Sequence, residues 1–289
     1  MRNSFEKKTV FFAVLLTIAL LCVPSAFAQG TPQTADDFNE RGIEFFNNGD
    51  WNKAIADFSQ AIKLGPDNPV FINNRGFAYL LTEEYEKAIA DITQAIGLDP
   101  GDPEKFNNRG FCYYKLDDNN KAIADYNQAL KLDSNYGITY ENRGLSYMEL
   151  KEYDKAIADF SQMIKMEPNN PNKYYARANA YIEKKDYDKA IADYSQIIKL
   201  DNKSHNAFYN RGFTYSLKGD DKKAIADYTQ ALKLESNNPV VLYLRGLSYF
   251  KTKDYKKAIA DYEEALQYAP GSVLITDALE EAQNASKKK

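Results

Sequence analysis

Apolar and polar positions recur along this chain with a fixed period. The pentapeptide Lys-Ala-Ile-Ala-Asp occurs seven times, first at residues 53–57 and last at residues 257–261, and each copy begins 34 residues after the one before. Within each period, two stretches with helical spacing of apolar residues alternate with polar segments rich in Pro, Asn and Gly. This pattern predicts two helices of about fourteen residues per period. Each unit would bury its apolar face against its neighbours, as in a stacked repeat protein.

Small and large side chains take fixed places in the repeat. Counting from Ala35 as position 1, position 8 is always Gly or Ala and position 11 is always aromatic, from Phe45 in the first unit to Tyr249 in the last. In the second helix, Ala54 and its equivalents are followed one turn later by Phe, Tyr or Ile. Such an arrangement favours two antiparallel helices that interlock closely.

Gly or Ala at position 8, Tyr at position 11, Ala at position 20 and a late Pro make this 34-residue pattern similar to the tetratricopeptide repeat. The resemblance implies an all-α protein, a right-handed superhelical solenoid of helix-turn-helix units in which the first helix of each pair lines a concave groove. We expect seven such units over residues 35–272, followed by a capping helix and basic tail at 273–289 with an apolar stripe of Leu274, Ala278, Leu279 and Ala282. The unit boundaries are 35–68, 69–102, 103–136, 137–170, 171–204, 205–238 and 239–272.

The first 28 residues differ from the rest. Arg2, Lys7 and Lys8 precede an uncharged run at 10–23, and Ala26-Phe27-Ala28 supplies the small-x-small pattern of a signal-peptidase site. The run is shorter than the roughly 20 residues of a bilayer span. We expect a cleavable signal peptide at 1–28, a short linker at 29–34, and an exported protein that is periplasmic or secreted, with a bacterial source favoured. An uncleaved anchor is the alternative.

Charge and reactive residues narrow the class of function. The net charge is −4, which argues against nucleic acid, because a phosphate-binding surface needs a basic excess. Cys22 would leave with the signal peptide, so that Cys112 stands alone. The single His205 lies in a polar segment without a second ligand, and no Gly-rich phosphate loop occurs. We therefore expect a protein that is not an enzyme and uses no cofactor or metal.

An arginine occupies position 7 of every unit, on the side that faces the core. A lone buried charge is costly, and Asp of the pentapeptide is the acid that also recurs in all units. We expect stacked Arg–Asp pairs, formed within or between repeats. The alternative is a row of arginines that binds phosphate or carboxylate.

Positions 2, 5, 6, 9 and 13 fall within an arc of roughly 100° on the opposite side of the first helix. We call this arc the groove face. It carries amides and aromatic rings that we expect to be exposed, and such groups suit an extended peptide: amides would pair with its backbone and rings would receive its side chains. The alternative is that Asn is soluble filler and the rings pack on adjacent helices. The candidate binding residues are Asn73, Asn74, Phe77, Asn107, Asn108, Phe111, Asn142, Tyr175, Asn179, Tyr209, Asn210, Phe213 and Tyr243.

These observations favour a non-enzymatic module that binds an extended segment of another protein in its groove. One rival is a scaffold or assembly factor of an envelope complex that uses the convex face and the ends. A less favoured rival is an accessory to envelope polysaccharide processing, in which aromatic rings stack on sugars. That role would call for paired acids in an enclosed pocket, and the sequence contains no such pattern.

Overall fold

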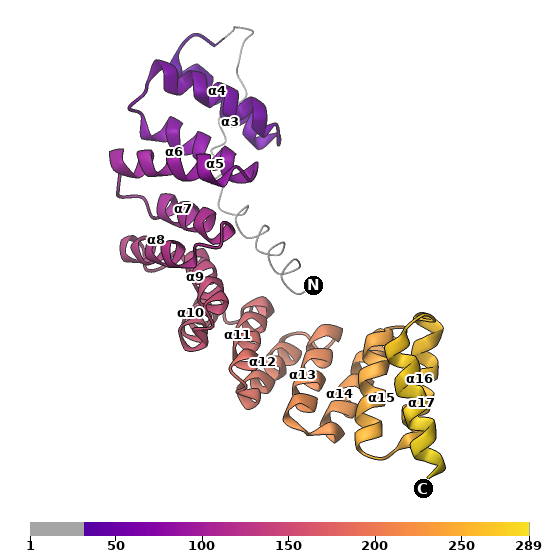
Figure 1. Ribbon diagram of the computed structural model, residues 1–289. Helices are drawn as coiled ribbons and strands as arrows, with labels where there is room; N and C mark the ends of the chain where they lie inside the picture. The colour runs from indigo at the N-terminus through magenta and orange to yellow at the C-terminus, as the bar shows by residue number, and fades with distance from the viewer. Residues whose placement is uncertain (1–31, 289) are drawn as a thin grey trace. The chain divides into compact units, whose positions relative to one another are not determined.

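The computed structural model describes residues 32–288, and this part of the chain contains α-helices, turns and no strand (Figure 1). Its helices fall into two compact units, divided between Glu152 and Tyr153. The first unit holds α3 (Ala35–Asn47), α4 (Trp51–Leu64), α5 (Pro69–Leu81), α6 (Tyr85–Leu98), α7 (Pro103–Lys115), α8 (Asn119–Leu132) and α9 (Gly137–Glu149). The second unit holds α10 (Tyr153–Met166), α11 (Pro171–Glu183), α12 (Tyr187–Leu200), α13 (His205–Lys218), α14 (Asp221–Leu234), α15 (Pro239–Lys251), α16 (Tyr255–Tyr268) and α17 (Val273–Lys287). The predicted all-α class is confirmed.

Consecutive helices pack on one another within each unit, so the chain forms helix pairs in tandem. The glycines at position 8 are the points of closest approach. A Cβ atom on Gly110 would lie 2.7 Å from Cε1 of Tyr126, and one on Gly246 would lie 2.6 Å from Cε1 of Tyr262. Both distances are shorter than any van der Waals contact, so the rings of Tyr126 and Tyr262 leave no room for a side chain at Gly110 or Gly246. In the fifth repeat, Ala178 packs in the same core cluster as Tyr194. The predicted interlocking of small and large residues is confirmed.

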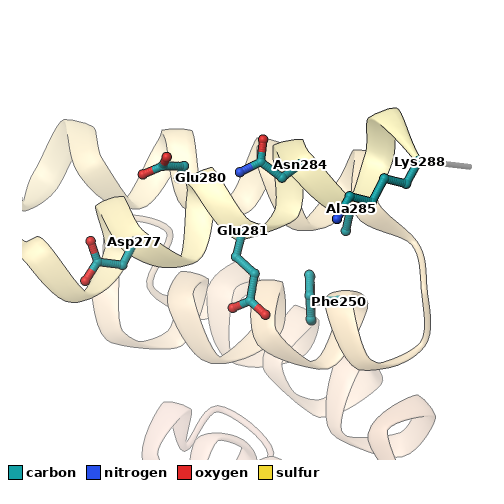
Figure 2. A pocket seen from close by; sticks show the side chains of 7 residues that line it. All are labelled: Phe250, Asp277, Glu280, Glu281, Asn284, Ala285 and Lys288. Carbon is teal, nitrogen blue, oxygen red and sulfur yellow. The ribbon is translucent and has the colours of Figure 1, made fainter.

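The last helix, α17, packs on α16 and covers the end of the second unit. Its buried residues are Ile275 and Ala282, and Ala278 and Leu279 are partly buried against the same core. The predicted apolar stripe is therefore wrong at one position, because Leu274 is 62% exposed and Ile275 takes its place. Figure 2 shows this helix beside Phe250 of α15, with the acidic side chains Asp277, Glu280 and Glu281 projecting from it.

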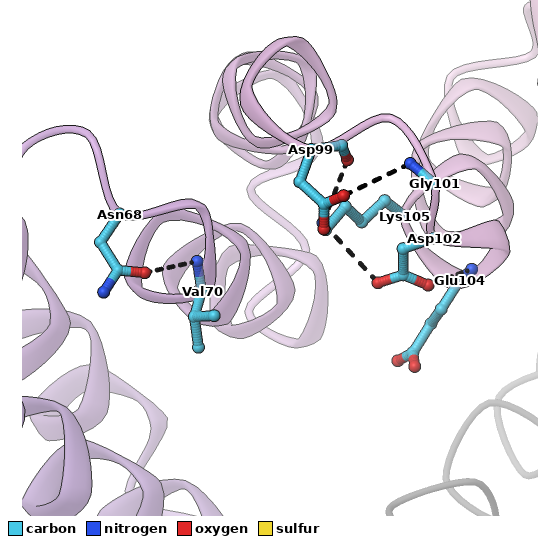
Figure 3. A network of polar contacts seen from close by, with 7 residues as sticks. All are labelled: Asn68, Val70, Asp99, Gly101, Asp102, Glu104 and Lys105. Carbon is cyan, nitrogen blue, oxygen red and sulfur yellow. Dashed lines mark hydrogen bonds and ion pairs between the residues drawn. The ribbon is translucent and has the colours of Figure 1, made fainter.

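Pro and a short polar residue fix the start of several first helices. Pro69 and Pro103 are the first residues of α5 and α7, where a missing N–H costs nothing. The residue before each proline caps the helix: Oδ1 of Asn68 accepts from the N–H of Val70 at 2.9 Å, and Oδ1 of Asp102 accepts from the N–H of Glu104 at 2.9 Å (Figure 3). The polar loops predicted from the sequence therefore separate the helix pairs.

Two features lie outside what the structure tests. The predicted signal peptide at 1–28 lies outside the described residues. The superhelical course and the repeat boundaries stay predictions, although each of the first helices begins at the first residue of a predicted unit, as α11 does at Pro171 and α15 at Pro239.

Candidate functional site

Six of the seven arginines at position 7 each bind the aspartate of their own repeat. Nε and Nη2 donate to the two carboxylate oxygens, at 2.6–2.9 Å, in a bidentate pair. The pairs are Arg41–Asp57, Arg75–Asp91, Arg109–Asp125, Arg177–Asp193, Arg211–Asp227 and Arg245–Asp261. The predicted pairing is confirmed for these repeats, and it is formed within each repeat.

From the second repeat onward, the guanidinium group at position 7 also bonds to the preceding repeat, a contact that the sequence analysis missed. Nη1 donates to a Ser, Thr or Asn oxygen there, at 2.7–3.3 Å. The acceptors are Ser59, Thr93, Asn127, Ser161, Ser195 and Thr229. These polar residues share position 25, and the last repeat, which no further arginine follows, has Glu263 there. Because these contacts hold the repeats together, the geometry favours a structural role for the arginines over an anion-binding one.

The groove face of the first unit is built from paired amides. Nδ2 of Asn74 donates to Oδ1 of Asn39 on the neighbouring first helix, at 2.8 Å. Nδ2 of Asn142 donates to Oδ1 of Asn107 at 3.1 Å, and the Thr139 hydroxyl donates to the same oxygen at 3.1 Å. In each pair an Asn at position 6 bonds to the Asn at position 5 of the preceding repeat. The face is therefore a set of cross-helix amide contacts.

Some amide atoms on this face are left without a partner among the described residues. They are Oδ1 of Asn73 and Oδ1 of Asn142, both of them buried. A buried donor or acceptor without a hydrogen bond is costly and rare in native proteins.

Burial on this face differs from the sequence expectation. Asn107, Asn108, Phe111 and Asn142 are buried, with 2–3% of their surface exposed, so the expectation that they are exposed is wrong. Amide pairing between adjacent helices and contact of Phe111 with the core around Tyr126 account for this. Asn179 is exposed, and the remaining candidates are half-buried: Asn73, Asn74, Phe77, Tyr175, Tyr209, Asn210, Phe213 and Tyr243.

The groove face of the second unit is built from tyrosines. Position 5 holds Tyr175, Tyr209 and Tyr243, and each ring lies against the position-24 tyrosine of its own repeat, with centroids 5.8, 6.5 and 5.9 Å apart. Burial raises the pKa of Tyr175 and Tyr209 above its ordinary value, so both hydroxyls stay neutral near pH 7. Here the hydroxyl of Tyr194 donates to Oδ1 of Asn179 at 3.1 Å. These half-buried rings offer flat apolar surface with a polar edge.

Cys112 and His205, the residues with the most reactive side chains, make structural contacts. Cys112 is fully buried, and burial raises the pKa of its thiol to about 12, which removes thiolate reactivity near neutral pH. His205 begins α13, stacks on Tyr209, and places Nδ1 3.1 Å from the carbonyl oxygen of Ala231. Within residues 32–288 no group of three His, Cys, Asp or Glu side chains is placed to hold a metal ion.

A helix needs roughly 20 predominantly apolar residues to cross a bilayer. Across residues 32–288, none combines enough residues with enough apolar character to span a membrane.

Comparison with known families and structures extends these findings. The tetratricopeptide repeat pattern matches residues 103–136, 138–170, 205–238 and 239–272, a second version of it matches 71–102, and the related TPR repeat pattern matches 42–83 and 178–219. Among curated proteins, no match to the chain is found.

Solved structures with the same fold share about a fifth of their residues with this chain. The C-terminal part of a TPR repeat-containing protein from Cytophaga hutchinsonii is 20% identical with a TM-score of 0.75, over 83% of this chain and 98% of that one. A tetratricopeptide repeat protein from Parabacteroides merdae is 20% identical with a TM-score of 0.60, over 87% and 100%. YrrB, described as a TPR protein with an unusual peptide-binding site, is 19% identical with a TM-score of 0.55, over 65% and 97%. At this identity the likeness concerns the fold.

Proposed function

Since the chain belongs to the tetratricopeptide repeat family, whose repeats indicate a protein–protein interaction module, we propose that it is a non-enzymatic protein that holds an extended segment of another protein along its groove face. The observation that carries the proposal is the pair of surfaces on this face: amide side chains in the first unit and half-buried tyrosines in the second. Amides bind a peptide backbone whatever its sequence, whereas rings select side chains.

Site-specific photo-cross-linking tests this proposal. A photoreactive phenylalanine analogue replaces Phe77 or Phe213 on the groove face, and in matched controls it replaces the exposed Gln60 or Gln230 on second helices. The mature protein is then irradiated with the envelope fraction of its source cells, and mass spectrometry identifies the cross-linked peptides. Cross-links from the groove positions to one continuous segment of a partner support the proposal. Cross-links from Gln60 and Gln230 alone would favour the scaffold alternative, in which the outer surface binds.

We also propose that the protein is exported, because a basic start, a short apolar run and Ala26-Phe27-Ala28 stand at the beginning of the sequence. The mature chain would begin at Gln29. N-terminal mass spectrometry of the protein from fractionated cells tests this point. An intact Met1 on an abundant cytoplasmic form would contradict export, and it would leave the binding proposal unaffected.

A further inference from the structure

A cavity lies at the end of the second unit, where the groove face of α15 meets the capping helix α17. Its volume is 410 Å³. The side formed by α15 and α16 is largely apolar and aromatic, with Tyr243, Leu247, Phe250 and Tyr262. The rings of Tyr243 and Tyr262 have centroids 5.9 Å apart. Aromatic rings therefore form one wall of this cavity.

The side formed by α17 is acidic. Asp277 and Glu281 line the cavity together with Leu274 and Ala278, and they also line an adjoining hollow of 530 Å³ around Phe250. Figure 2 shows the Glu281 side chain reaching from α17 toward Phe250. Glu280 also lines the adjoining hollow, but it does not line the cavity. Burial, together with the neighbouring Tyr243 and Glu281, raises the pKa of Tyr262 well above its ordinary value.

Positive charges near this cavity leave the two carboxylates unneutralised. Lys251 lines the cavity, but its Nζ atom lies 3.8 Å from Oδ1 of Asp221 and 3.4 Å from the hydroxyl oxygen of Ser216, on the preceding repeat. Lys288 lines the adjoining hollow only. Considering the described residues alone, neither Asp277 nor Glu281 forms an ion pair. Asp277 and Glu281 therefore lie unpaired beside the aromatic rings that line the cavity.

The acids continue the groove face. If the repeat numbering is carried past residue 272, Asp277 and Glu281 fall at positions 5 and 9, which hold Tyr243 and Leu247 in α15. In the second unit the other first helices carry Tyr, Phe, Asn or Leu at these positions. A segment lying along the tyrosine face would therefore meet its first pair of carboxylates at this cavity.

We propose that this cavity takes a lysine or arginine side chain of the extended segment, and the proposal rests on the function proposed above. The aliphatic stem would lie on Leu247 and Leu274. The cationic end would face the rings of Tyr243 and Phe250 and be neutralised by Asp277 and Glu281. The partner is thus a segment that carries a basic residue next to residues suited to the tyrosine face.

Peptide selection followed by a double-mutant cycle tests the proposal. Short random peptides displayed on phage are selected on the mature protein and, in parallel, on the Asp277→Asn/Glu281→Gln variant and on Glu280→Gln, a control that removes one carboxylate from the same helix outside the cavity. We expect Lys and Arg to be enriched in peptides selected on the unmodified protein and on Glu280→Gln. The enrichment should disappear on the double variant.

A labelled peptide from that selection is then titrated against the same proteins, with its basic residue intact or replaced by norleucine. The double variant should weaken binding of the basic peptide by about tenfold, as expected for a charge and cation–π contact, and leave the norleucine peptide within about twofold. Equal losses for both peptides, or peptides without any basic enrichment, overturn this inference alone. Failure to select any peptide on the unmodified protein would overturn both the inference and the proposed function. Thermal melting of each variant confirms that its fold is retained.

Discussion

The two units present different chemistry from the same repeat positions. At position 5 the first unit has Asn39, Asn73, Asn107 and Glu141, whereas the second has Tyr175, Tyr209 and Tyr243. The amides bond across to the neighbouring first helix, and the tyrosines lie against the second helix of their own repeat. Both faces rest on the same Arg–Asp pairs. The difference teaches that the same repeat architecture accepts different chemistry at the groove-face positions, amides in one unit and aromatic rings in the other.

Alkaline pH should separate the two units most strongly. In the second unit the pKa is raised for Tyr175, Tyr194, Tyr209, Tyr228 and Tyr262. In the first unit it is raised for Tyr85, Tyr126 and Cys112. Burial is the main cause for each, and it penalises the ionised form.

The sign follows from linkage. A group whose pKa is higher in the folded state contributes stability that is complete below the unfolded-state pKa and is lost as pH rises through the folded value. The loss begins near pH 9.0 for Cys112 in the first unit and near pH 10.0 for the tyrosines, of which more are affected in the second unit. We expect helicity by circular dichroism to fall before the fluorescence of Trp51, the one tryptophan, which lies in the first unit. Simultaneous changes, or an earlier change at Trp51, would contradict a difference between the units.

Loss of an Arg–Asp pair should destabilise both units equally. Replacing Asp91 or Asp227 by Ala leaves a partly buried guanidinium group without its carboxylate, and each change should lower the free energy of unfolding by about 3 kcal/mol. As a control, Asp188→Ala removes an exposed ion pair with Lys218 and should cost less than about 1 kcal/mol. Urea denaturation measures all three. A large effect in one unit only would show that the units do not share one frame.

On the tyrosine face, Tyr209→Ala should weaken binding of a selected peptide by about 1–2 kcal/mol, because a half-buried ring is lost from the contact surface. Tyr209→Phe keeps the ring and should bind within about twofold of the unmodified protein. Fluorescence anisotropy with the labelled peptide measures both. Unchanged binding by Tyr209→Ala would place the site off this face.

The amide face should give the smallest effect. Asn74→Ala removes the cross-helix bond to Asn39 and should lower the free energy of unfolding by about 1 kcal/mol. Asn210 occupies the same position in the second unit, but its Nδ2 donates to the carbonyl oxygen of Asn206 in its own helix. Asn210→Ala should therefore cost less. The reverse order in urea denaturation would mean that the amide contacts do not hold the first unit together.

The sequence predicted those features that depend on one repeat alone. Helix pairing and the Arg–Asp contacts follow from residues that recur in every unit, as Gly110 opposite Tyr126 and Arg109 opposite Asp125 show. Contacts between repeats were harder to foresee. The acceptor row that includes Ser59 and Thr93 could have been found from its polar character at position 25.

The groove face was predicted less well, because its exposure depends on how neighbouring helices approach. The burial of Asn107 arises from bonds to Thr139 and Asn142 of the next repeat, which no helical wheel of a single unit contains. The same holds for the cavity at α17, which needs residues from three helices.

The doubly bonded arginine also constrains how such a chain can change in length. Arg75 stands 16 residues after Ser59 and 16 residues before Asp91, and it bonds to both. Gene duplication or loss of a whole 34-residue segment restores every such triplet across the new junction. An insertion of any other length between a Ser and its Arg would shift the donor away from its acceptor. These hydrogen bonds therefore allow the array to lengthen or shorten only by whole repeats. They supply a simple reason why the 34-residue period is unbroken from the first copy to the last.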